Sequence, residues 1–147
     1  MKNYILFFLA LSLFTCSCST SDNDGNKALQ DSVIAVHDEV MPLMGGFVRN
    51  SIKIDSILMN LPEIKSQNPE LDTTTLRTDL LELKRNLDSS SESMTDWMHG
   101  FEVEYEGKSK EEIEEYLKNE LLKINEVKQK FDSTSEESKI KLKDFQN

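Results

Sequence analysis

Apolar residues recur at alternating steps of three and four along three stretches of the chain. The first series is Leu29, Val33, Val36, Val40, Met44, Phe47, Ile54, Leu58 and Leu61. The second is Leu76, Leu80, Leu83, Leu87, Met94, Met98 and Phe101, and the third is Ile113, Leu117, Ile124, Val127, Phe131, Leu142 and Phe145. This spacing puts the apolar side chains on one face of an α-helix, as in a coiled coil. The chain is therefore expected to form three amphipathic helices.

Prolines and capping residues predict where these helices begin and end. The expected ranges are 28–61, 69–103 and 109–146. Pro42 lies inside the first helix, but the apolar spacing continues across it, so we expect a kink there and not a break. Asn68 can cap the second helix, with Pro69 at its first position. Ser109 and Glu112 have the spacing of a capping box at the start of the third helix.

Polar residues interrupt the apolar series at two places. In the second helix, Ser89, Ser90 and Ser91 occupy the turn where an apolar side chain is expected. In the third helix, Thr134 and Ser138 fall at core positions. We therefore expect loose packing around the three serines, and we expect the last turns of the third helix to splay away from the bundle.

Residues 28–147 are expected to form one all-α domain. The segment does not alternate apolar and polar residues over enough positions to predict a strand. Because the connections are short, consecutive helices should lie antiparallel. At ~1.5 Å per residue, helices of this length predict an elongated, coiled-coil-like antiparallel three-helix bundle about 50 Å long.

The composition argues against several classes of function. The 147 residues include 27 Asp and Glu but only 17 Lys and Arg, which gives a formal net charge of -10. Nucleic acid is not an expected partner, because binding phosphates takes clustered cations. The sequence holds only five Gly and contains no GxGxxG, GxxxxGK[ST], HExxH or GxSxG motif. We therefore expect neither enzymatic activity nor a cofactor.

The N-terminal residues have the pattern of a lipoprotein signal peptide. A basic start is followed by an apolar run over residues 4–14, which is too short to span a bilayer. The next residues resemble a lipobox, where a signal peptidase cuts just before a Cys that carries lipid. The small residue Ser17 precedes Cys18, whereas the bulky Phe14 lies two residues before Cys16, so Cys18 is favoured over Cys16. The expected segments are a signal peptide over 1–17 and a disordered acidic tether over 18–27.

Several segments resemble a family of small helical lipoproteins of the Bacteroidota. They are His37–Gly45, Met94–Phe101, Tyr116-Leu117 and Lys123–Lys128. The family is often labelled "viral A-type inclusion protein", a label that describes coiled-coil-like composition and implies no reaction. The resemblance implies a lipid anchor and a helical fold, and it supplies no catalytic residue. The acidic run after Cys18 also resembles the surface-export signal of Bacteroidota lipoproteins, although a plain solvated linker explains it equally.

One set of side chains has the chemistry of a soft-metal site. Its members are His37, Met41, Met44, Met94 and Met98, with Trp97 beside them. Helical periodicity puts the members from each helix on one arc, and an antiparallel hairpin that turns near residue 65 brings the two arcs together. Thioether and imidazole ligands suit Cu(I) or Ag(I). Methionine is also a common filler of helical cores, so plain core packing explains the same pattern.

Together these features favour a lipid-anchored extracytoplasmic protein with a non-catalytic role in interaction or envelope structure. The expected partners are the membrane, through the N-terminal lipid, and an unidentified envelope protein. The expected location is the outer membrane of a bacterial envelope, with either leaflet open. The alternative is a Met/His-rich lipoprotein that binds Cu(I) or Ag(I).

Overall fold

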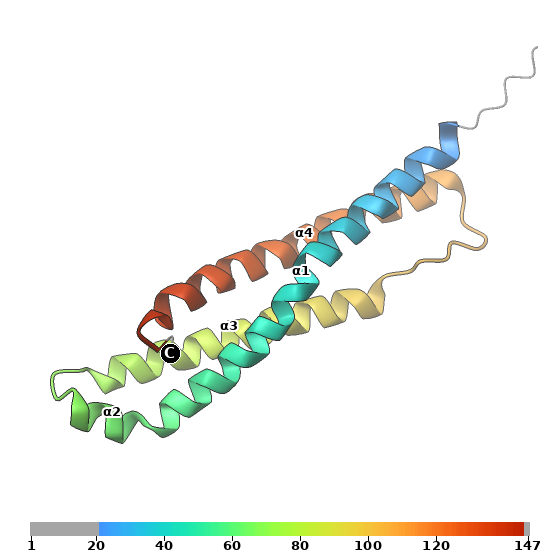
Figure 1. Ribbon diagram of the computed structural model, residues 1–147. Helices are drawn as coiled ribbons and strands as arrows, with labels where there is room; N and C mark the ends of the chain where they lie inside the picture. Colours follow the sequence, from blue (N-terminus) through green and yellow to red (C-terminus); the bar gives the residue numbers. More distant parts are fainter. Residues whose placement is uncertain (1–20, 146–147) are drawn as a thin grey trace, which may run out of the picture.

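The computed structural model describes residues 21–145, and it describes side chains from residue 25 onward. In chain order the elements are α1 (Ser21–Met59), α2 (Leu61–Gln67), α3 (Thr73–Gly100), α4 (Lys110–Lys141) and a short 3-10 helix, η1 (Lys143–Phe145). Figure 1 shows α1, α3 and α4 as three long helices packed side by side. The described part of the chain is all-helical, and the expected helical bundle is confirmed.

Consecutive long helices run antiparallel, and α1 and α4 point the same way (Figure 1). Ser51 of α1 lies beside Asp88 of α3, with 3.4 Å between the hydroxyl and a carboxylate oxygen. Phe47 of α1 stacks on Phe131 of α4, with 4.6 Å between ring centroids and 10° between the ring planes. Each helix therefore packs against both others, and the core lies along their shared axis.

The core consists mainly of the predicted apolar series. Its fully buried side chains include Val33, Val40, Ile54, Leu80, Leu83, Leu87, Met94, Leu117, Ile124 and Phe131. Two further core residues, Ile57 and Trp97, lie outside the predicted series. Both are next to predicted positions on their helix, because the buried face of each helix is wider than a strict coiled-coil stripe.

The first helix begins earlier than predicted. We expected residues 18–27 to be a disordered tether, but α1 begins at Ser21. The Asn26 side-chain amide donates a 3.1 Å hydrogen bond to the backbone carbonyl of Lys110, and Lys27 forms a 2.8 Å ion pair with Asp31 one turn later. These contacts extend α1 alongside the start of α4. As predicted, Pro42 does not break α1, which continues through it to Met59. Residues 1–20, which include Cys16 and Cys18, lie outside the described part of the chain.

The connection between the first two long helices differs from the prediction. The short helix α2 begins at Leu61, and Pro62 lies in its first turn, which suits the fixed φ of proline. Asn68 closes α2 by donating its backbone N–H to the carbonyl of Ile64 and does not cap the next helix. Instead, the Asp72 carboxylate accepts the backbone N–H groups of Thr74 and Thr75 at 2.9 and 3.1 Å. The second long helix therefore begins at Thr73 and not at residue 69.

The capping box predicted at the start of the third long helix is confirmed. The Ser109 hydroxyl accepts the backbone N–H of Glu112, and the Glu112 carboxylate accepts the backbone N–H of Ser109 at 2.7 Å. The second long helix ends at Gly100 and not at residue 103, because Phe101 is extended and the following N–H, from Glu102, donates to the Tyr116 hydroxyl at 2.7 Å. Gly107, at φ +78°, makes the turn before α4.

Three of the polar residues within the apolar series are buried, namely Ser90, Thr134 and Ser138. Ser90 and Thr134 face each other across α3 and α4, with 3.0 Å between their hydroxyl oxygens. The pair occupies the layer that was expected to pack loosely, and a pocket of about 320 Å³ lined by Ser89, Ser90 and Thr134 lies beside it. Hydrogen bonds explain the burial of the pair, because Ser90 donates to the Asn86 carbonyl at 2.7 Å and accepts the hydroxyl proton of Thr134.

The end of α4 also stays docked, so the expected splaying is wrong. Lys141 forms a 2.8 Å ion pair with Glu137 and lies 3.8 and 3.6 Å from Asp79 and Glu82 of α3. Partial burial disfavours the charged form, but these carboxylates outweigh it and raise the pKa of Lys141. Leu142 is buried directly after this cluster. The ion pairs and this apolar anchor hold the last turns against α3.

Candidate functional site

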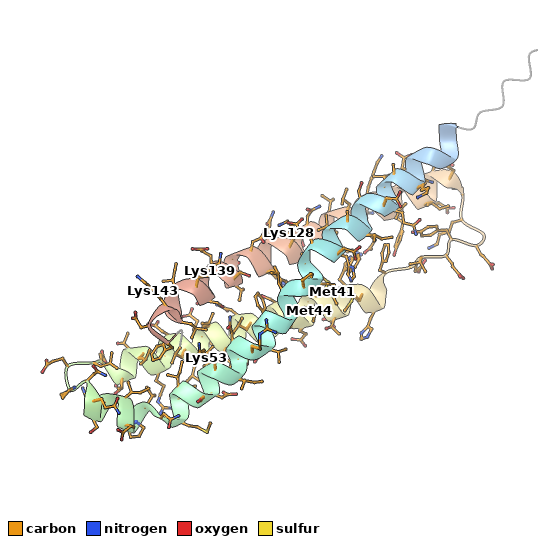
Figure 2. The ribbon with its side chains drawn as sticks, in the orientation of Figure 1. Met41, Met44, Lys53, Lys128, Lys139 and Lys143 are labelled. Carbon is orange, nitrogen blue, oxygen red and sulfur yellow. The ribbon has the colours of Figure 1, made fainter. Side chains whose placement is uncertain are left out.

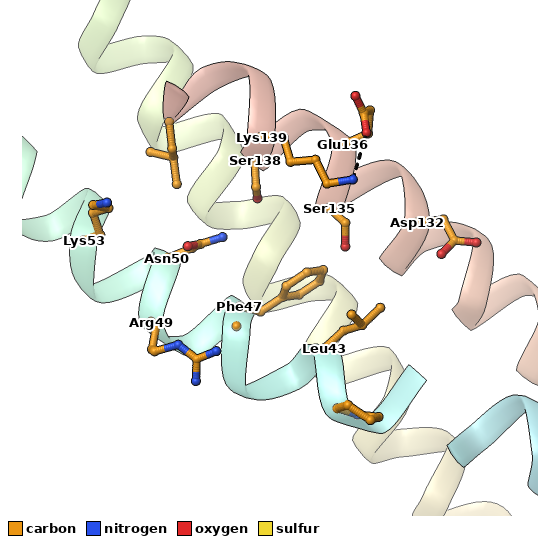
Figure 3. A pocket seen from close by; sticks show the side chains of 13 residues that line it. Leu43, Phe47, Arg49, Asn50, Lys53, Asp132, Ser135, Glu136, Ser138 and Lys139 are labelled. Atoms are coloured by element: carbon orange, nitrogen blue, oxygen red, sulfur yellow. Dashed lines mark hydrogen bonds and ion pairs between the residues drawn. The ribbon is translucent and has the colours of Figure 1, made fainter. Parts of the chain in front are cut away.

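A groove of about 650 Å³ runs between α1 and α4 (Figure 3). It is lined by Pro42, Leu43, Gly46, Phe47, Arg49, Asn50, Lys53, Asp132, Ser135, Glu136, Ser138, Lys139 and Leu142. Phe47 joins the groove to the core, because it lines the groove and stacks on the buried Phe131. Its volume is within the range of natural small-molecule sites.

The inner wall of the groove carries a hydroxyl group without a hydrogen-bond partner. Ser138 is 4% exposed, and its Oγ atom makes no hydrogen bond within the described residues. Figure 3 shows Ser138 and Ser135 pointing from α4 toward the side facing Asn50 of α1. A buried hydroxyl without a partner costs free energy, so this position calls for a partner from outside the chain.

Other serines in these helices show how unusual Ser138 is. Ser32, Ser90, Ser91 and Ser93 each donate to the backbone carbonyl four residues earlier, at 2.7 to 3.0 Å. Helical serines commonly make this bond. Ser138 does not make it, although it is buried like Ser90. Its hydroxyl therefore lies unpaired just beneath the groove surface.

The acidic side chains of the groove are neutralised by lysines of α4. Asp132 forms a 2.8 Å ion pair with Lys128, and Glu136 forms a 3.2 Å pair with Lys139. Hydrogen bonds to Asp132 and Glu39 raise the pKa of Lys128. Once these pairs are counted, the remaining charge of the groove is positive.

The positive charge comes from α1. Arg49 and the half-buried Lys53 form no ion pair within the part of the chain that the structure describes. The Arg49 guanidinium lies back over Gly45, where a Cβ atom would sit 3.4 Å from Nη1. Lys53 lies on the α1 side and Lys139 on the α4 side (Figure 2). The groove is therefore a locally cationic site on an acidic protein.

The predicted soft-metal residues are partly brought together. His37 lies next to Trp97, with 5.7 Å between ring centroids, so the two predicted arcs do meet. Met94 is fully buried, and Met41, Met44 and Met98 pack against the core as half-buried side chains. Met41 and Met44 lie in the middle of α1 (Figure 2). Within residues 25–145, no group of three or more His, Cys, Asp or Glu side chains is placed to hold a metal. Methionine thioethers are not among these kinds of side chain.

A row of aromatic rings extends from Trp97 toward the loop between α3 and α4. Phe101 stacks on Trp97 at 4.9 Å, and Tyr116 continues the row at 6.3 Å. Lys108 lies 5.0 Å from the centre of the Tyr116 ring, and burial raises the pKa of Tyr116. The Trp97 indole N–H is buried without a partner among the described residues. The row could not be predicted from the sequence, because the loop between α3 and α4 decides whether Tyr116 lies next to Phe101.

Exposed apolar side chains form a third feature, which we call the apolar stripe: Val48, Ile52, Met59 and Leu81. The α1 members are 56%, 64% and 75% exposed, and helical periodicity puts them on one face. Leu81 of α3 lies alongside, because the 2.9 Å ion pair between Asp55 and Lys84 sets the two helices in register there.

No known protein family, curated protein or solved structure matches this chain. The resemblance to helical Bacteroidota lipoproteins therefore stays a sequence-based expectation. Within residues 21–145, no helix is long and apolar enough to cross a membrane.

Proposed function

We propose that this protein is a lipid-anchored, non-catalytic interaction protein of a bacterial outer membrane, attached through Cys18. The observation that carries the proposal is the apolar stripe. Its side chains are large and exposed, and the three from α1 share one face of that helix. Removing apolar area from water stabilises a complex by about 25 cal/mol per Å². Large exposed apolar side chains that share a helix face are typical of sites that bind other proteins.

The stripe lies far from the proposed anchor. Val48 is 27 positions after the first residue of α1, a distance of about 40 Å along a helix. Figure 1 shows the start of α1 at one end of the bundle and α2, which follows the stripe, at the other. A lipid on Cys18 would therefore leave the stripe free to meet a partner beyond the membrane surface, and we take that partner to be an envelope protein.

Charges on the stripe should abolish the interaction without unfolding the bundle. The measurement is chemical cross-linking of the protein to its partner in intact cells. We expect the double variant Val48→Lys, Ile52→Lys to lose the cross-linked products that the unchanged protein gives, because burying an unpaired ammonium group costs several kcal/mol. The control is the double variant Leu122→Lys, Ile140→Lys, which places the same two charges on exposed residues of α4. Cross-linked products that persist in the α1 variant, or that vanish equally in the control, would exclude the stripe as the interface.

A soft-metal role is the second candidate, because His37 of α1 lies against Trp97 of α3. The His37 Nδ1 atom is 2.9 Å from Asp38, which leaves Nε2 as the nitrogen able to bind a metal. The thioethers of Met41, Met44, Met94 and Met98 are the other proposed ligands for Cu(I) or Ag(I). Core packing still explains the same side chains, so we rank this role second.

A silver titration separates the metal site from a plain core. A site would take up one Ag(I) per chain, quench Trp97 fluorescence and stabilise the fold by mass action. Met41→Leu and Met98→Leu nearly conserve volume, so in a plain core each should cost under ~1.5 kcal/mol. We expect the core result, with small stability changes and no stoichiometric uptake. A one-to-one titration that both variants abolish would establish the metal role instead.

A further inference from the structure

We propose that the groove between α1 and α4 binds a small organic anion, a carboxylate or a phosphate monoester on a compact apolar body. This proposal is independent of the protein partner inferred above, because the apolar stripe does not line the groove. It rests on a set of unpaired polar groups, on the charge of the groove and on its apolar wall.

Three unpaired polar side chains face the same space. The Ser138 and Ser135 hydroxyls and the Asn50 amide all line the groove, and none of them makes a side-chain hydrogen bond within residues 25–145. All three can donate a hydrogen bond. An anionic oxygen accepts several such bonds at once, and bonds to a charged group are about twice as strong as neutral ones. The site is therefore suited to an acceptor-rich group.

The charges select an anion over a cation. Arg49 and Lys53 have no carboxylate partner among the described residues, whereas Asp132 and Glu136 are each paired with a lysine. Half-burial of Lys53 lowers the effective dielectric around it and strengthens its attraction for an opposite charge. A cationic ligand would meet two unpaired positive charges and no free negative one.

Apolar side chains from both helices give the groove room for an apolar body. Leu43, Phe47, Pro42 and Leu142 line the same groove, and Phe47 is held in place by its stack on Phe131. A ring or short alkyl chain can lie against these side chains while its acidic group meets Asn50 and Ser135, with the Ser138 hydroxyl just beneath them. An inorganic ion would leave the apolar wall in contact with water, so we expect the body to contribute to affinity.

Calorimetric titration of the purified protein tests this inference. The anionic probes are phenylacetate and phenyl phosphate, which separate a carboxylate ligand from a phosphate ligand. The controls are phenethylamine, which has a similar body and a positive charge, and acetate, which lacks the ring. We expect one saturable site for at least one of the anionic probes, with phenethylamine and acetate each binding ~10-fold more weakly or not at all.

Two variants connect the binding to the proposed side chains. Ser138→Ala and Lys53→Gln should each weaken the anion about 10-fold, since each removes a bond to a charged group. Ser138→Ala should leave the unfolding midpoint unchanged or raise it, because it removes an unpaired hydroxyl. Lys118→Gln is the matched control: it changes the net charge equally but lies outside the groove, beside Glu114, and should bind normally.

Three results would overturn the inference. The first is no saturable binding of either anion up to on the order of 10 mM. The second is equal binding of phenethylamine. The third is a Ser138→Ala variant that binds normally but is less stable, which would mean that the hydroxyl holds a structural water.

Discussion

Replacing Leu80 with Ala should lower the free energy of unfolding by ~2–5 kcal/mol, because it removes buried methyl groups and leaves a cavity. Leu80 is fully buried in the core, and Leu83, one turn further along α3, should behave in the same way. A domain of this size has a total stability of ~5–15 kcal/mol, so either change removes a large part of it. Urea unfolding followed by circular dichroism measures the effect.

Leu122→Ala provides the matched control for both substitutions. Leu122 is an exposed leucine in the middle of α4, so its loss should shift the urea midpoint only slightly. Equal midpoints for the Leu80, Leu83 and Leu122 variants would contradict the packing described for α3.

Replacing Cys18 with Ala should abolish lipid labelling and release the protein from the membrane, because the proposed anchor has no substitute on the mature chain. Labelling with a palmitate analogue, followed by membrane fractionation, measures both effects. Cys16→Ala should keep label and location. If the Cys16 variant loses the label and the Cys18 variant keeps it, the lipid site is Cys16, and if both single variants keep it, the anchor proposal fails.

The long helices could be predicted from the sequence because their signal is local. The steps of three and four through Val33, Val40 and Leu80 report directly on which helix face is buried, and these side chains are fully buried. The capping box at Ser109 is equally local, since both of its hydrogen bonds join residues three apart. Such features need no knowledge of the neighbouring helices.

The predicted start of the second long helix, at residue 69, is wrong because two possible capping residues lie within five residues of each other. Asn68 and Asp72 are both good capping residues. The structure uses Asn68 to end α2 and Asp72 to begin α3. Two threonines decide the outcome, since Thr74 and Thr75 donate backbone N–H groups to Asp72, and Thr75 adds its hydroxyl at 2.7 Å. These bonds lower the pKa of the Asp72 carboxyl.

The groove could not be predicted because it depends on how α1 and α4 are aligned. Asn50 and Ser138 are 88 positions apart in sequence, and only the parallel packing of their helices places them on one groove. The sequence did carry a signal, since Ser138 interrupts the apolar series. That interruption predicts weak packing at Ser138, whereas the structure buries the Ser138 hydroxyl beside a cationic groove.

The N-terminal peptide of the protein isolated from cells tests the proposed anchor most directly. Mass spectrometry should find a chain that begins at Cys18 and carries a diacylglyceryl group on the sulfur, with no peptide from residues 1–17 attached. An unmodified Cys18 preceded by the intact apolar run at residues 4–14 would contradict the lipid-anchored protein proposed here.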